Sequence, residues 1–118
     1  MKKIALFVVF ICMSFVSCTT SKPAVATTSL EGTWELKYIT GPRIAFDGLY
    51  PNSKPTIAFN LKENKITGNN SCNQYFGALL VDGAKINFND DKMGMTMMAC
   101  QGNGDSIYMD TLKKVESY

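Results

Sequence analysis

The sequence contains no histidine among its 118 residues, and this absence excludes several kinds of catalytic and metal site within the chain. Ser-His-Asp and Cys-His centres need an imidazole as general base, and the usual zinc sites need it as a ligand. Asp47 and Asp90–Asp91 could still pair as acid and base, but they lie beside glycine or asparagine in turn-like sequence, where carboxylates are usually solvated. We therefore expect no enzymatic activity and no cofactor.

The sequence also lacks an apolar run long enough for a mature transmembrane helix. Its longest run, Ile4 to Val16, follows Lys2 and Lys3 and is shorter than the roughly 20 residues that span a bilayer. This pattern is typical of a signal peptide, which we assign to residues 1–17.

The end of that run, Ser17–Cys18, resembles the cleavage site of a lipoprotein signal. In such a signal the cysteine becomes the acylated first residue of the mature protein and carries palmitate or a similar chain. Ordinary signal-peptidase cleavage nearby is the alternative. Residues 18–29, mostly Thr, Ser and Ala, predict a flexible tether. The expected location is the cell envelope, with Cys18 anchoring the protein to the outer membrane so that it faces the periplasm.

Little net charge is left once the signal peptide is removed. Of the 12 basic side chains, Lys2 and Lys3 leave with it, so that the basic and the 10 acidic side chains balance. The largest remaining basic cluster is Lys113–Lys114. Because nucleic-acid binding depends on clustered Lys and Arg side chains that neutralise phosphates, we exclude nucleic acid as a partner.

The sequence is also poor in cysteine, with 4 residues in all. Cys12 leaves with the signal peptide and Cys18 would take the lipid, so Cys72 and Cys100 remain as an even pair in an oxidising compartment. We expect a disulfide between them. Two buried free thiols are the alternative, because free cysteine is commonly buried as a small apolar residue.

Alternating apolar and polar side chains predict several short strands. We expect them at residues 33–38, 57–61, 65–67, 74–81 and 84–88, with a further extended segment at 93–99. Hairpin corners are predicted at Gly68–Asn70 and Asp82–Gly83, a strand end at Asn89–Asp91 and a long loop over 41–55. A helix of about eleven residues, capped by Asp105 or Ser106, follows. The expected fold class is mainly β (α+β), a small antiparallel barrel-like sheet with one C-terminal helix.

Three ordered motifs carry a family resemblance. They are Leu30-x-Gly32-x-Trp34, then Gly68-x-x-x-Cys72-Asn73-x-Tyr75-x-Gly77, and later Thr96-x-Met98-Ala99-Cys100. Together they resemble the META domain family of HslJ-type bacterial lipoproteins, over residues 30–118. The resemblance implies a non-enzymatic envelope protein that binds a partner or supports stress tolerance of the heat-shock kind. Ser71 departs from the family pattern, which usually has glycine at this place.

The chain also stops at Tyr118, whereas family members usually continue through a final strand pair. We therefore expect a C-terminally incomplete domain whose sheet is left open. An open sheet edge presents unpaired N–H and C=O groups, which invite another chain to pair with them. Self-association, or a protein partner bound at this edge, is the expected consequence.

Two alternative functions remain from the residues themselves. Met93, Met95 and Met97, with Met98 beside them, would place three thioethers on one face of a strand, a soft donor set suited to Cu(I). A methionine-filled core is the structural alternative. The other function is binding of a small apolar ligand inside the barrel, although small barrels are usually filled by their own side chains. The inward-facing residues would be Trp34, Leu36, Ile57, Phe59 and Phe88.

Overall fold

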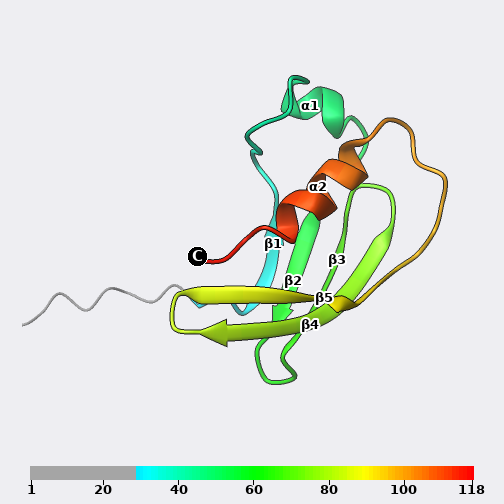
Figure 1. The fold of residues 1–118 in the computed structure, drawn as a ribbon. Helices are drawn as coiled ribbons and strands as arrows, with labels where there is room; N and C mark the ends of the chain where they lie inside the picture. Colours follow the sequence, from blue (N-terminus) through cyan, green and yellow to red (C-terminus); the bar gives the residue numbers. More distant parts are fainter. Residues whose placement is uncertain (1–28) are drawn as a thin grey trace, which may run out of the picture.

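The computed structural model describes residues 29–118, so the predicted signal peptide, the lipidation site Cys18 and the tether up to residue 28 lie outside the described residues. The described elements are β1 (Gly32–Glu35), α1 (Phe46–Leu49), β2 (Thr56–Asn60), β3 (Lys65–Asn69), β4 (Gln74–Asp82), β5 (Lys85–Met95) and α2 (Gly104–Leu112). The strands form one antiparallel sheet in chain order. The sheet curls into a half-barrel, and α2 crosses its concave side (Figure 1). The predicted fold class is confirmed.

The core lies between the concave face of the sheet and α2. Ile66, Tyr75 and Leu79 are almost fully buried and alternate with more exposed neighbours, as expected for strands with one solvent-exposed face. Phe59 and Phe88 add a ring pair with centroids 6.4 Å apart. Burying an aliphatic or aromatic side chain of this size contributes roughly 1.5–3 kcal/mol, so these alternating positions set which face turns inward.

The hairpin between β4 and β5 follows the prediction at its tip, but β5 is longer than expected. Asp82 ends β4, and Gly83 takes a φ of +60°, a backbone conformation that glycine adopts at little cost. The predicted strand end at Asn89–Asp91 is wrong. Ala78 pairs with Asn89 and Phe76 pairs with Gly94, so residues 90–93 form a bulge opposite Gly77 and the strand continues.

The first strand is shorter than predicted, and the long loop contains a helix. β1 ends at Glu35, after which the Leu36 amide donates a hydrogen bond to the carbonyl of Pro55 over 2.8 Å. The loop then forms α1, whose Leu49 is buried. The hydroxyl of Tyr50 donates to the carbonyl of Gly104 over 3.0 Å, which ties the loop to the start of α2.

Packing determines where α2 begins. The predicted caps Asp105 and Ser106 are wrong, because Asn103 occupies the N-cap position and makes no side-chain cap hydrogen bond. Gly104 is buried where an added Cβ would lie 2.5 Å from the Leu49 carbonyl oxygen, so a glycine is needed at this contact. Tyr108, Met109 and Leu112 are the buried side chains of the helix.

The C-terminal segment lies along part of the β5 edge. The Ile86 amide donates to the carbonyl of Glu116 over 3.0 Å, and the Tyr118 amide donates to the carbonyl of Ala84 over 3.1 Å. These bonds and the bulge at residues 90–93 both interrupt the edge that a second strand could use. Less of this edge is therefore open than the sequence led us to expect.

Gly68 offers the sharpest test of the packing. An added Cβ would overlap the Thr56 carbonyl oxygen and lie 2.5 Å from the Tyr75 hydroxyl. Because the first neighbour is backbone, we expect Gly68→Ala to lower the free energy of unfolding by at least about 3 kcal/mol in urea denaturation.

Gly77→Ala is the matched control, because the nearest neighbours of its added Cβ would be Met93 and Ile66 side-chain atoms at 3.5 Å or more. We expect that variant to lose less than about 1 kcal/mol. Equal losses in the two variants would show that the close approach at Gly68 does not limit packing.

Candidate functional site

The turn between β3 and β4 does not have the corner predicted at Gly68–Asn70. Gly68 lies in β3, which runs on to Asn69, and the turn takes residues 70–73. The positive φ belongs to Ser71, at 88°. Side chains with a short amide form the turn instead, since the side-chain oxygen Oδ1 of Asn69 accepts a hydrogen bond from the Ser71 backbone amide over 2.8 Å.

Asn70 is fully buried and stabilises this turn. Its Oδ1 accepts from the backbone amides of Cys72 over 3.1 Å and of Asn73 over 2.7 Å. Its Nδ2 donates to the sulfur of Met95 over 3.2 Å, which attaches the turn to the end of β5. Sequence reasoning missed Asn70, although a pair of asparagines at a hairpin corner is typical of such side-chain-to-backbone bonds.

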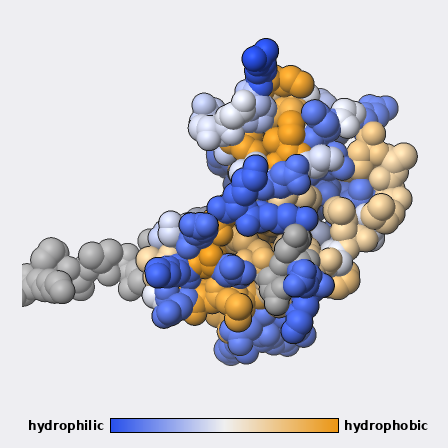
Figure 2. All heavy atoms as spheres, in the orientation of Figure 1, coloured by the Kyte–Doolittle hydropathy of each residue, from blue (hydrophilic) through white to orange (hydrophobic). Residues whose placement is uncertain are grey.

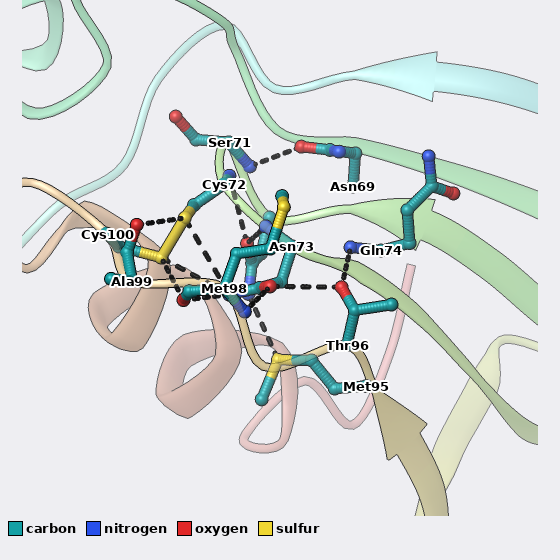
Figure 3. Close-up of a disulfide and its surroundings, with 11 residues drawn as sticks. Asn69, Ser71, Cys72, Asn73, Gln74, Met95, Thr96, Met98, Ala99 and Cys100 are labelled. Atoms are coloured by element: carbon teal, nitrogen blue, oxygen red, sulfur yellow. Dashed lines mark hydrogen bonds between the residues drawn. A yellow bond between two sulfur atoms is a disulfide. The ribbon is translucent and has the colours of Figure 1, made fainter.

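Asn73 holds the segment that follows β5. Its Oδ1 accepts from the Met98 amide over 2.7 Å and from the Thr96 hydroxyl over 3.0 Å. Its Nδ2 donates to the Met98 carbonyl over 3.2 Å and to the Cys100 sulfur over 3.2 Å. A side-chain amide has two acceptor sites and two donors, and here all are used. We call this arrangement the Asn73 clamp (Figure 3).

A disulfide between Cys72 and Cys100 closes the clamp, as the cysteine count predicted. The two Cα atoms lie 5.8 Å apart, within the usual range for a bridge. It closes a loop with a sequence separation of 28 residues, for which chain entropy gives a stabilisation of about 3.5 kcal/mol.

The other motif residues connect the clamp to the core. The Tyr75 hydroxyl donates to the Thr56 carbonyl over 2.9 Å and lies 2.7 Å from the hydroxyl of Tyr108. Burial raises the pKa of both phenols, so both stay protonated and can donate. Gly68 leaves room for the Tyr75 ring, and Gly77 is buried beside Met93. The residues of the second and third motifs therefore form one structural unit.

The methionines do not form the predicted single face. β5 ends at Met95, so Met97 lies beyond the strand that was expected to carry all three thioethers. Met93 packs against the core, Met95 accepts the hydrogen bond from Asn70, and Met97 is largely exposed. A methionine-filled core is likewise wrong for Met97 and Met98.

The residues predicted to bind an apolar ligand mostly fill the interior. Phe59 and Phe88 are buried, and Leu36 and Ile57 pack against the same core. Trp34 pairs with Ile57 and shares its face, but at the sheet edge it is 44% exposed. An open groove of about 760 Å³ lies elsewhere, lined by Leu80, Val81, Asn87, Glu116 and their neighbours. Figure 2 shows apolar surface on either side of the polar outer face of α2.

The curled antiparallel sheet, with its disulfide-linked clamp, is a small β domain of the kind that the three motifs predicted. The family model described as META domain matches residues 27–118, and the chain belongs to this family. Neither the curated proteins nor the solved structures include a match to the chain.

Ser71 is the position at which the clamp departs from the family pattern, and its backbone explains why glycine suits it. A non-glycine residue with φ of 88° carries conformational strain of about 1 kcal/mol or more. We expect Ser71→Gly to raise the free energy of unfolding by about 1 kcal/mol, measured by urea denaturation.

Asn64→Gly is the matched control, since Asn64 has a φ of 51° but asparagine tolerates this region. The gain there should be no more than a few tenths of a kcal/mol. A Ser71→Gly variant that is no more stable than the wild-type protein would show that the turn carries no strain at this residue.

Proposed function

We propose that the chain is an HslJ-type, lipid-anchored protein of the cell envelope that acts by binding a protein partner in envelope stress tolerance, without catalysis. The observation that carries the proposal is the Asn73 clamp with its disulfide. There, residues of the family motif hold the β3–β4 turn and the segment after β5 together.

The disulfide supports the location. Disulfides persist in oxidising compartments such as the periplasm and are rare in the cytosol, where thiols are kept reduced. Cys72 and Cys100 are bridged to each other, and Cys18, which lies outside the described residues, is the cysteine that we propose takes the lipid. Within residues 29–118 the structure contains no helix with the length and apolarity needed to cross a bilayer.

The hydrogen bonding supports a binding role over catalysis. The polar atoms of Asn70 and Asn73 are engaged by backbone groups, by Thr96 and by sulfur atoms. Tyr75 and Tyr108 bond to each other and to the Thr56 carbonyl. A nucleophile or general base has to be able to reach a substrate, whereas these side chains form hydrogen bonds within the protein.

The sheet edges are the surfaces that support partner binding. The outer edge of β1 carries the half-exposed Trp34, and the edge of β5 beyond Ile86 is not covered by the C-terminal segment in the described part of the chain. An extended segment of a partner, or of a second copy, would add main-chain hydrogen bonds at such an edge. The aromatic side chain of Trp34 would add buried contact area.

Lipidation of Cys18 is the step that tests the proposed anchoring. When the full gene is expressed in a bacterium with a lipoprotein pathway, intact-mass analysis of the membrane fraction should show a diacyl or triacyl N-terminus on Cys18. Cys18→Ala should move the protein to the soluble fraction, because the variant lacks the cysteine that carries the acyl chains.

Cys12→Ala is the matched control, because it changes a cysteine of the signal peptide and should leave the membrane fraction unchanged. A mature protein that begins at another residue, or a Cys18→Ala variant that stays in the membrane fraction, would contradict the anchoring.

A further inference from the structure

The methionines of the described chain differ widely in exposure although four of them lie within six positions. Met109 is buried in the core at 7%, and Met93 packs against the core. Met95 is 40% exposed, Met98 is 61% exposed and Met97 is 87% exposed. An oxidant reaches a thioether only where the sulfur is accessible, so this segment presents a graded series of targets.

The two most exposed methionines lie on a segment that is held by its backbone. The Met98 amide and carbonyl both bond to the Asn73 side chain, and the Thr96 amide donates to the Gln74 carbonyl over 2.9 Å. The position of the segment therefore does not depend on burying the side chains of Met97 and Met98. Either side chain can become polar without loss of a core contact.

We propose that Met97 and Met98 form a sacrificial oxidation site that consumes two-electron oxidants such as hydrogen peroxide and hypochlorous acid. With peroxide, the thioether sulfur attacks one oxygen, an S–O bond forms, the O–O bond breaks, and the products are a methionine sulfoxide and water. With hypochlorous acid, the products are the sulfoxide, chloride and a proton. In both reactions the sulfur loses the two electrons that the oxidant gains.

Met95 is the neighbour that this site protects. Its sulfur accepts the hydrogen bond from the buried Asn70, which in turn caps the turn amides of Cys72 and Asn73. Oxidation of that sulfur would add an oxygen at a contact where the sulfur and the Asn70 amide nitrogen are 3.2 Å apart, so the buried amide would have to move. Oxidation of Met97 or Met98 would not displace Asn70 in this way.

The first measurement is the rate of sulfoxide formation at each methionine of the folded full chain in hydrogen peroxide, followed by peptide mass spectrometry. Met97 and Met98 should react at least about threefold faster than Met95 and about tenfold faster than Met109. The melting temperature should be unchanged after Met97 and Met98 have reacted and should fall only when Met95 reacts.

The second measurement uses hypochlorous acid in less than molar equivalence, where the methionines compete for it. The double variant Met97→Leu, Met98→Leu should form more Met95 sulfoxide than the wild-type protein, whereas the control Met93→Leu should not. Equal Met95 oxidation in the double variant and the wild type would overturn the proposal. Oxidation of Met109 as fast as Met97 would overturn it too, as would a double variant that melts well below the wild type, because its two side chains would then be structural.

Discussion

The side-chain amide of Asn73 joins two segments that the strand pairing leaves separate. β4 and β5 pair as far as Met95, after which the chain leaves the sheet and crosses to α2. All four hydrogen-bonding positions of Asn73 are used on that departing segment. Each bond of this kind contributes about 1 kcal/mol, and an unpaired buried amide costs more than that. The backbone bond between Thr96 and Gln74 fixes the start of this segment, and beyond it the direction of the chain toward α2 depends mainly on the Asn73 side chain. The disulfide limits how far the segment can separate if these bonds open.

Strand β4, which follows Asn73, connects the Asn73 clamp to the core. Tyr75, two residues after Asn73, crosses over Gly68 and bonds to the Thr56 carbonyl and to Tyr108 of α2. Its ring centroid lies 5.8 Å from that of Tyr108. The clamp, the three central strands and the helix are thus connected through a single strand, β4. Such a connected polar network inside an apolar core fixes one arrangement of the elements, because each member is satisfied only when the others are in place.

The sequence was sufficient for the features that depend on local pattern. The strands β2 to β4 follow from the alternation of apolar and polar side chains, and the Asp82–Gly83 hairpin follows from its turn residues. The pairing of Cys72 with Cys100 follows from the number of cysteines. The errors arise where distant contacts override local signals. The bulge opposite Gly77 absorbs the polar residues that were expected to end β5, and the contact of Gly104 with Leu49 sets the start of α2. Asn70 was missed because burial of an asparagine depends on partners that sequence period does not reveal.

Amide hydrogen exchange at Met98 tests most directly whether Asn73 orders the segment after β5. In the Asn73→Ala variant with the disulfide intact, the Met98 amide should lose its protection, since its acceptor is the Asn73 side chain. In the Cys72→Ser, Cys100→Ser variant, which keeps Asn73, the same amide should stay protected under native conditions even though the protein is less stable overall. Undiminished Met98 protection in Asn73→Ala would show that the disulfide alone positions the segment, and would contradict the central role of Asn73.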